Sequence, residues 1–584
     1  MLRRKILSAF VLYAFLLPVV AFAQTAAIYQ APKEAIDKIK DEGMKRSQVM
    51  NTLSYLTDVI GGRLTNSPSM KRANEWTRDT MAKWGMENAK LVAWGPFGRG
   101  WSLKRFSAQV SSPQAFPVIA YPKAWSPGLD KFAPQPTPVV NKKNKKNTEP
   151  QKVEPNTVLT TDVVYLDAET EADLEKYKGQ LKGKIVLVSG LREIKADFEG
   201  MGSRHDADSL LALANQQNPL LMQRPQGQIT QEQINRFMTR FVQGAKRMNF
   251  LMAEGAAMLV DNSFEGSGGT LFVGGASVAQ EIPANPMELF GARRLQPYQK
   301  ESESKMIPQM TMATEDYNRL VRMIKQGEKV QMTVDLAVQY HDEDLMGYNT
   351  VAEIPGTDPT LKEEIVMLGG HLDSWHASTG ATDNAAGCAV AMEAARILIA
   401  SGLKPRRTIR VALWSGEEQG LNGSREYVKQ TFGEMQGGIS AMQAMATGVQ
   451  PQAAQLVKKA DYEKLSAYYN LDNGTGKIRG VYLQGNDAVA PIFRQWLMPF
   501  AEMGATTLTL SNTGGTDHLS FDAIGLPGFQ FIQDEIEYDA RTHHSNQDNY
   551  DRLQTDDLKQ ASTIMAAFVY QTAMMDGKLP RKTR

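Results

Sequence analysis

The sequence predicts an α/β protein with a mainly parallel sheet covered on both faces, together with a separate β-rich domain in the middle of the chain. From residue 340 onward, continuous apolar runs alternate with helical segments, which is the pattern of buried parallel strands. Between residues 111 and 339, strand-like runs and prolines replace this alternation. The length of 584 residues also favours two or more domains over one.

The first residues of the chain are typical of an export signal. Basic residues at positions 3–5 precede an apolar run at 6–20, and Ala-Phe-Ala at 21–23 forms an A-x-A cleavage site. The run is shorter than the ~20 residues that span a bilayer, which favours a signal peptide over a membrane anchor. We therefore expect residues 1–23 to be removed, and we expect a secreted or periplasmic protein with no membrane partner.

Charge and cysteine content exclude several other classes. The chain has 65 basic and 64 acidic residues, so no overall field would draw it to nucleic acid. A Lys/Asn run at 142–146 lacks interleaved aromatic residues, so we interpret it as part of a solvated, flexible insertion at 134–155. Cys388 is the single cysteine, which rules out an intramolecular disulfide, and it lies in an Ala-rich helical stretch where we expect it to pack in a core.

The elements expected before residue 340 divide into two groups. Residues 47–84 carry apolar positions with helical spacing and indicate the beginning of the α/β domain, which we place at 24–110. Strand-like runs then indicate the β-rich domain at 111–339, and they lie at 116–121, 163–166, 185–188 and 256–260. Residues 206–252 have helical spacing but no chemistry that identifies a role.

The remainder of the chain, residues 340–584, carries the main part of the α/β domain. Buried strands are expected at 365–368, 409–414, 467–471 and 528–532, and a helix is expected at 384–400. In open sheets of this kind, functional sites gather at the carboxyl ends of the strands.

Side chains that bind metals follow each of these four strands. They are His371 with Asp373, the pair Glu417 and Glu418, Asp472, and the pair His543 and His544, while Asp383 opens the helix after the first strand. Taken singly, Asp383 fits a helix N-cap and Asp472 fits a turn. Their ordered recurrence at four strand ends favours a metal site instead.

These ligands suit a pair of metal ions. Two ions about 3.5–4 Å apart can share one bridging carboxylate, and Asp383 is the natural bridge. We assign His371 and Asp472 to the first ion, and Glu418 and His544 to the second. Zinc is favoured by the mixed imidazole and carboxylate ligands, although cobalt or manganese would fit the same set.

Two acidic neighbours of the ligands have expected roles in catalysis. Glu417 is placed to take a proton from a water shared by the ions and to return it to the leaving amine. Asp373, two residues after His371, is expected to orient that imidazole.

The same residues carry a family resemblance, which covers roughly two-thirds of the chain after its signal. The motifs are Gly-Gly-His-Leu-Asp-Ser-Trp at 369–375, Ala-Thr-Asp-Asn-Ala-Ala-Gly at 381–387, Trp-Ser-Gly-Glu-Glu-Gln-Gly at 414–420, and His544-Ser545 with Asp548. They resemble the di-zinc exopeptidase family of bacterial leucyl aminopeptidases, glutamate carboxypeptidase II and carboxypeptidase Q. The layout is most similar to carboxypeptidase Q-like bacterial peptidases.

The resemblance implies a three-layer α/β/α peptidase domain interrupted by a protease-associated domain, for which residues 182–188 and 255–260 are typical. It implies the ligands His371, Asp383, Glu418, Asp472 and His544, with Glu417 as the base. It also implies two zinc ions per chain, a short peptide or dipeptide substrate, and a homodimer such as many relatives form.

Several features of the sequence limit how far the roles of the family's residues can be assigned to this chain. Residues 431–462 lengthen the connection between Glu418 and Asp472, and His543 is an alternative to His544 as the last ligand. Asp517 and His518 lie in a segment, 514–521, that resembles a loop beside the family's active site; they are candidate substrate contacts, and a structural turn is an equal alternative. Tyr538 is a further candidate contact.

The leading hypothesis is a metal-dependent exopeptidase, either an aminopeptidase or a carboxypeptidase Q-like dipeptidase. The sequence does not show which peptide terminus must be free. Two alternatives are carried with it: a catalytically silent, receptor-like binding protein on the same fold, and a single-zinc acyl-transfer or cyclising enzyme. The complete ligand set and Glu417 argue against both.

Overall fold

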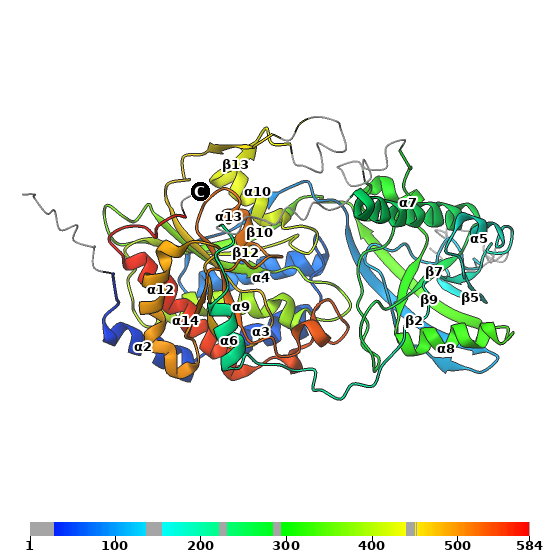
Figure 1. Ribbon diagram of the computed structural model, residues 1–584, viewed down its shortest axis with the longest axis horizontal. Helices are drawn as coiled ribbons and strands as arrows, with labels where there is room; N and C mark the ends of the chain where they lie inside the picture. Colours follow the sequence, from blue (N-terminus) through cyan, green and yellow to red (C-terminus); the bar gives the residue numbers. More distant parts are fainter. Residues whose placement is uncertain are drawn as a thin grey trace, which may run out of the picture.

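The computed structural model describes residues 28–135, 155–220, 231–283, 294–439, 450 and 452–582. The expected signal peptide at 1–23 and the Lys/Asn run at 142–146 lie outside these ranges. Within them, the strands form two eight-stranded sheets and a two-stranded ribbon. Figure 1 shows the two large sheets side by side along the long axis, each with its own helices.

The first sheet contains the four expected parallel strands as direct neighbours. Its order is β1-β10-β12-β11-β15-β18-β16-β17. The bounds are β1 Glu87–Trp94, β10 Gly347–Ile354, β12 Thr408–Trp414, β11 Ile365–His371, β15 Leu465–Asn470, β18 Gly528–Gln533, β16 Ile478–Tyr482 and β17 Thr507–Thr509. The pairs β12/β11, β11/β15, β15/β18 and β16/β17 are parallel, whereas the pairs β1/β10, β10/β12 and β16/β18 are antiparallel. The predicted mixed, mainly parallel sheet is confirmed.

Helices cover both faces of the first sheet because alternate residues of its strands face opposite sides. Val366 and Leu368 of β11 pack in one core, and Met367 packs in the other. The first core contains α2 (Lys33–Lys45), α3 (Val49–Ser54), α9 (Ala386–Ala400), α12 (Ala490–Leu497) and α14 (Thr555–Met574). The second contains α10 (Asn422–Thr431) and α13 (His518–Asp522). Cys388 is fully buried in α9, as expected.

The second sheet also combines antiparallel and parallel strands. Its order is β3-β2-β9-β5-β6-β7-β8-β4, with bounds β3 Phe116–Pro117, β2 Gly100–Ser112, β9 Gln331–His341, β5 Val158–Tyr165, β6 Ile185–Leu187, β7 Met258–Asn262, β8 Gln309–Met312 and β4 Ala120–Pro122. The strands β5, β6, β7 and β8 are parallel neighbours. The expected boundaries at 110/111 and 339/340 fall inside β2 and β9, which pair along their length.

Helices also pack on the second sheet, so this part of the chain is not built from strands alone. Helices α5 (Glu171–Glu175) and α7 (Gln231–Ala253) pack against Val186 on one face. Helix α8 (Thr314–Lys325) packs against Ile185 and Leu187 on the other. The helical spacing at 206–252 therefore corresponds to α7 and to a shorter helix, α6 (Ala207–Ala214).

Helix α6 lies away from the second sheet, against β17 at the edge of the first. In Figure 1 a long segment runs from the second sheet to α6 among the helices of the first sheet. Ser203 forms an antiparallel bridge with Ile536, and Arg204 forms ion pairs with Asp534 and Asp557. We call residues 201–220 the strap.

Two smaller features complete the fold. The long connection at 431–462 contains an antiparallel ribbon of β13 (Gly433–Gln436) and β14 (Gln455–Lys458), with residues 440–449 and 451 outside the described residues. Helix α4 (Pro68–Lys83) begins at an N-cap, Ser67, whose hydroxyl accepts a bond from the Met70 amide. In the described part of the chain, no helix combines the length and the apolar character needed to cross a bilayer.

Candidate metal centre

The predicted ligands meet at one edge of the first sheet because its parallel strands end there. Strand β11 ends at His371, and Asp472 follows β15 by two residues. After β12 the chain turns at Gly416, whose φ of +71° favours glycine and where a side chain would collide with Trp94, and then reaches Glu417 and Glu418. The histidines follow a short helical turn, Tyr538–Thr542, beyond β18.

The carboxylate of Asp383 lies between two groups of potential ligands. Its Oδ1 is 3.1 Å from His371 Nε2, and that nitrogen is 3.2 Å from Asp472 Oδ1. Its Oδ2 is 3.2 Å from His544 Nε2, which in turn lies 2.8 Å from Glu418 Oε2. Each oxygen of Asp383 thus faces one imidazole and one further carboxylate, the arrangement expected of a bridging ligand.

These separations fit the ligand shells of metal ions. Nitrogen and oxygen ligands lie about 2.0–2.2 Å from zinc in tetrahedral sites, which places neighbouring ligand atoms roughly 3.3 Å apart. The four distances around Asp383 are 3.1, 3.2, 3.2 and 2.8 Å. Atoms of His371, Asp383 and Glu418 also lie within 4.8 Å of one another, as do atoms of Asp383, His543 and His544.

Two buried oxygens at this centre make no hydrogen bond. They are Asp383 Oδ2 and Glu418 Oε1, and both are almost inaccessible to solvent. Burying a carboxylate oxygen without a partner is costly, so such atoms indicate a bound cation. The donor set of imidazole nitrogens and carboxylate oxygens suits zinc or a similar divalent ion.

Charge within the centre shifts the pKa values of its members strongly. Burial opposes protonation of His371 and His544, but the carboxylates beside them prevail, and the pKa of His544 rises to about 11. Burial and the charge of Asp383 raise the pKa of Glu418 to about 7. Burial would likewise raise the pKa of Asp383, but the two neighbouring histidines hold it well below its usual value. Without a cation, the cluster retains protons that a divalent ion would replace.

Asp373 supports the centre in two ways. His371 Nδ1 lies 3.0 Å from the backbone carbonyl oxygen of Asp373, so the expected orienting contact comes from the main chain, while the nearest carboxylate oxygen is 3.6 Å away. The Asp373 carboxylate instead accepts hydrogen bonds from the Glu417 and Glu418 amides, each at 3.3 Å, and from Thr65 Oγ1 at 2.9 Å. It therefore fixes the turn that carries the proposed base and a ligand.

Other supporting residues were missed as site residues by sequence reasoning. Asp548, noted above only as part of a motif, accepts bonds from the amides of Thr382 at 2.6 Å and Asp383 at 3.1 Å, and burial raises its pKa to about 7. Arg63 is fully buried and donates to the carbonyls of Leu372 at 2.6 Å and Gly380 at 2.7 Å, which joins the loops that carry the ligands. No local signal marks Arg63, because its partners lie some three hundred positions away in the chain.

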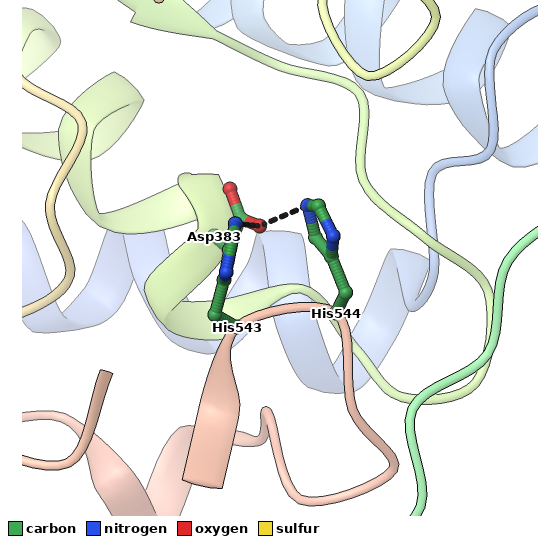
Figure 2. Close-up of side chains that lie close together, drawn as sticks. All are labelled: Asp383, His543 and His544. Atoms are coloured by element: carbon green, nitrogen blue, oxygen red, sulfur yellow. Dashed lines mark ion pairs between the residues drawn. The ribbon is translucent and has the colours of Figure 1, made fainter. Parts of the chain in front are cut away.

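His543 and His544 differ in their distances to the carboxylates of the centre. Figure 2 shows both imidazoles beside Asp383, with their rings 3.8 Å apart. His543 Nε2 lies 3.9 Å from Asp383 Oδ2, compared with 3.2 Å for His544, which also contacts Glu418. The geometry favours His544 as the ligand and places His543 against the ring of Tyr538, at 4.9 Å.

The three candidate substrate contacts occupy different surroundings. Asp517 is fully buried, and its charge adds to the burial and the Asp472 charge that raise the pKa of Glu417 well above its usual value. His518 is buried with Nε2 at 2.7 Å from the Gln484 side chain, and burial lowers its pKa to about 4. Tyr538 is buried beside His543 and lines a cavity of about 280 Å³. Their roles as substrate contacts stay predictions.

The second sheet reaches this centre through its loop at 271–273. Phe272 forms an antiparallel bridge with Ser545, and the Val273 amide donates to the His544 carbonyl oxygen at 3.2 Å. Leu271 and Asn546 exchange hydrogen bonds, from the Leu271 amide to Asn546 Oδ1 at 2.9 Å and from the Asn546 amide to the Leu271 carbonyl at 3.1 Å. The loop that carries His544 is thus held by both parts of the chain.

Comparison with known proteins identifies the same region. Residues 349–569 match the sequence profile of Peptidase family M28. Carboxypeptidase Q from Mus musculus is 30% identical over 276 residues, which cover 47% of this chain and 52% of that protein, and carboxypeptidase Q from Rattus norvegicus is 29% identical with the same coverage. The chain spans about half the length of these curated relatives.

A solved structure supports the fold. The crystal structure of a peptidase M28 precursor from Shewanella amazonensis SB2B superimposes with a TM-score of 0.58 and 20% sequence identity. The match covers 94% of this chain and 99% of that chain, so it includes both large sheets. At this identity the likeness establishes the fold alone.

Proposed function

Since residues 349–569 belong to Peptidase family M28, we propose that this protein is a metal-dependent exopeptidase that hydrolyses a terminal bond of dipeptides or short peptides. The observation that supports this most directly is the carboxylate of Asp383, each of whose oxygens faces one imidazole and one further carboxylate. The export signal expected at residues 1–23 supports a secreted or periplasmic location.

The ligands divide into two sets in this proposal. His371 and Asp472 would hold one ion, Glu418 and His544 would hold the other, and Asp383 would bind both. When bound, two zinc or similar ions would polarise the scissile carbonyl group and make a water molecule acidic enough to lose a proton near neutral pH. The unpartnered oxygens of Asp383 and Glu418 support the fit.

Side chains of the protein transfer the proton and hold the base and the bridging ligand in position. Glu417 accepts the proton of the attacking water and returns it to the amine that leaves, a role that suits a carboxylate held next to a ligand but outside the ligand set. The Asp373 carboxylate keeps the Glu417 amide in place at 3.3 Å. Asp548 fixes the backbone at Asp383, so that the bridging carboxylate is oriented before substrate binds.

The substrate proposal follows the relatives. The carboxypeptidase Q proteins of mouse and rat match 276 residues of this chain, and their name denotes cleavage at a carboxyl terminus, which supports a substrate with a free carboxyl end close to the scissile bond. An aminopeptidase acting on longer peptides is the nearest alternative within the same chemistry. The two differ in whether a free carboxylate close to the scissile bond is required.

The test is to count metal ions and turnover in the purified protein from Gln24 onward. We expect two divalent ions per chain by elemental analysis, and hydrolysis of dipeptides or aminoacyl amides that stops on chelation and returns on addition of zinc. Asp383→Asn should lower both the ion count and the turnover, because it removes the shared ligand. Bound metal without hydrolysis of any such substrate would instead indicate a binding protein built on a peptidase fold.

A further inference from the structure

A cavity of about 600 Å³ opens between the candidate metal centre and the second sheet. Trp375, Glu418 and Gln419 line it on the side of the first sheet. Helix α7 and residues within 275–280 and 294–298 line the opposite side. Sites for small ligands commonly measure about 300–1,000 Å³, so a molecule the size of a dipeptide fits beside Glu418.

Three arginines line this cavity together with Glu418, and we call them the arginine wall: Arg240, Arg247 and Arg294. Arg240 and Arg247 are seven residues apart on α7, which places them on the same face, two turns apart. Gly244 lies between them and leaves the space that a side chain would fill. The guanidinium of Arg294 lies 5.1 Å above the ring of Phe241, which limits its orientations.

Among the residues that the structure describes, the acidic groups that line the cavity do not balance the positive charge of the arginine wall. The acidic side chains that line it are Asp261 and Glu418. Asp261 forms an ion pair with Lys123, and Glu418 contacts His544 in the metal centre. Arg247 Nη1 donates one bond to the Val188 carbonyl oxygen at 3.2 Å, which leaves its other donors for a ligand.

A neighbouring cavity shares part of the same helix. Arg240 and Arg247 also border a space of about 640 Å³ in which Glu169 and Glu171 lie. Glu171 is paired with Lys246, so Glu169 remains as the acidic group on that side. Among the described residues, Arg240 and Arg247 face this one carboxylate, which still leaves an excess of positive charge.

We propose that the arginine wall binds a carboxylate on the residue that follows the scissile bond, so that the substrate extends from Glu417 and Glu418 toward α7. This inference rests on the proposed function. Guanidinium groups bind carboxylates through paired N–H donors, with a geometry that lysine does not reproduce. The preferred substrates are peptides whose leaving residue carries a carboxylate, either the α-carboxylate of a dipeptide or an acidic side chain.

The experiment compares three probes on the metal-loaded protein: alanyl-leucine, alanyl-leucine amide, and alanyl-glutamic acid α-amide. We expect kcat/KM for alanyl-leucine to exceed that for its amide by about tenfold or more. Arg294→Gln and Arg247→Gln should each lower kcat/KM for alanyl-leucine by about tenfold, with a much smaller change for the amide. The glutamyl probe distinguishes the two sources, because it carries a side-chain carboxylate and no α-carboxylate.

Arg319→Gln is the matched control. Arg319 lies on α8 with its guanidinium 3.6 Å above the Phe116 ring, outside the lining of this cavity, and its substitution should leave the ratio of acid to amide unchanged. Equal hydrolysis of alanyl-leucine and its amide by the unmodified protein would overturn the inference while leaving the proposed function intact. Equal losses on both substrates in the Arg294 and Arg247 variants would also overturn it.

A binding measurement separates this inference from failure of the proposed function. If no probe is hydrolysed although metal is bound, the proposed function fails, and calorimetric titration with alanyl-leucine and with its amide then decides the inference alone. Tighter binding of the acid that Arg294→Gln weakens by about tenfold would support it. Equal affinities for the acid and the amide would refute it.

Discussion

The two large sheets share an arrangement of four parallel strands, but they differ in the side chains that follow the carboxyl ends of those strands. Each contains four neighbouring parallel strands, β12-β11-β15-β18 in the first and β5-β6-β7-β8 in the second. In the first, the strand ends lead to His371 and Glu418. In the second, they lead to Ser189, Asn262 and Thr314.

The polar residues that follow the strands of the second sheet, Ser189, Asn262 and Thr314, are hydrogen-bonded to their neighbours. Thr314 Oγ1 donates to Asn262 Oδ1 at 2.8 Å, and Tyr317 donates its hydroxyl to the Ser189 carbonyl oxygen at 2.7 Å. Arg192 Nε donates to Thr314 Oγ1 and to the Ser263 carbonyl oxygen, both at 3.1 Å. One buried oxygen there, Glu315 Oε2, makes no hydrogen bond, whereas at the first sheet two carboxylates of one cluster, Asp383 and Glu418, each have such an oxygen.

This difference shows that sheet topology and side-chain chemistry contribute separately to forming a metal site. Parallel strands that end together create a place where loops converge, and both sheets have one. Metal chemistry requires in addition a set of donors that neutral hydrogen bonds do not satisfy.

The largest effect is expected from Glu417→Gln at the first sheet. Because an amide cannot accept the proton of the attacking water, kcat should fall by about 10³-fold while the metal content stays unchanged. Steady-state kinetics with a dipeptide and elemental analysis measure the two quantities. Asn262→Ala at the second sheet is the control and should keep kcat within about twofold. A loss of less than about tenfold in Glu417→Gln would show that another group acts as the base.

Asp548→Asn should weaken metal binding by about 10- to 100-fold, because the buried carboxylate that holds the Asp383 backbone becomes neutral. Competition with a chromogenic chelator measures the affinity. The matched control is Asp335→Asn on β9, whose carboxylate pairs with Arg105 and accepts a bond from Thr157 in the second sheet. Equal metal affinities in the two variants would mean that Asp548 has no part in orienting the ligand.

At the second sheet, Arg192→Met should change stability without changing chemistry. It leaves the Ser263 carbonyl and Thr314 without their donor, so we expect the free energy of unfolding to fall by about 1–3 kcal/mol. Chemical denaturation measures this, with kcat and metal content unchanged. A fall in kcat at temperatures where the variant is fully folded would contradict the contrast between the sheets, because Arg192 would then affect catalysis as well as stability.

The smallest effect concerns His376, which lies where the two sheets meet. Its Nε2 is 2.7 Å from the Pro122 carbonyl oxygen, and burial lowers its pKa from 6.5 to about 4. Between pH 6.5 and pH 4 the unfolded chain therefore binds more protons than the folded one, so stability falls as the pH falls through this window. Since the residue as a whole is only half-buried, we expect about 1 kcal/mol.

The measurement for His376 is a difference between two proteins. The free energy of unfolding is measured for the unmodified chain and for His376→Gln at pH 7 and at pH 4.5. Comparing the two proteins cancels the contributions of the other titrating groups, which both chains share. The unmodified chain should lose more stability on acidification. Parallel losses in both chains would show that His376 titrates normally in the folded protein.

The first sheet could be predicted from sequence because its strands are continuous apolar runs. Residues 365–368 and 409–414 were expected as strands, and they lie within β11 and β12. That several candidate ligands would lie close together could be predicted because they follow such strands closely. Asp383 and the histidine pair lie further away, fifteen positions after Leu368 and eleven positions after Ile532.

The residues that position the candidate ligands could not be predicted, because their hydrogen bonds join positions that lie far apart in the sequence. Thr65 bonds to Asp373 from 308 positions away, and the Asp548 carboxylate bonds to the Asp383 amide from 165 positions away. The strap also gave no signal, since helical spacing at 207–214 does not reveal against which sheet the helix packs. Long-range packing of this kind depends on the folded topology rather than on local periodicity.

The strap has a consequence for motion. The chain passes into and out of the second sheet through adjacent strands, β2 and β9, and such a pair of connections by itself would permit a hinge rotation between the sheets. The strap adds a further connection, because Arg204 is bound to Asp534 and Asp557 on the opposite side of the junction. Rigid-body opening would have to break these ion pairs and detach α6 from β17. Substrate access to the metal centre is therefore expected to depend on local movement of loops, with the two sheets held at a fixed angle.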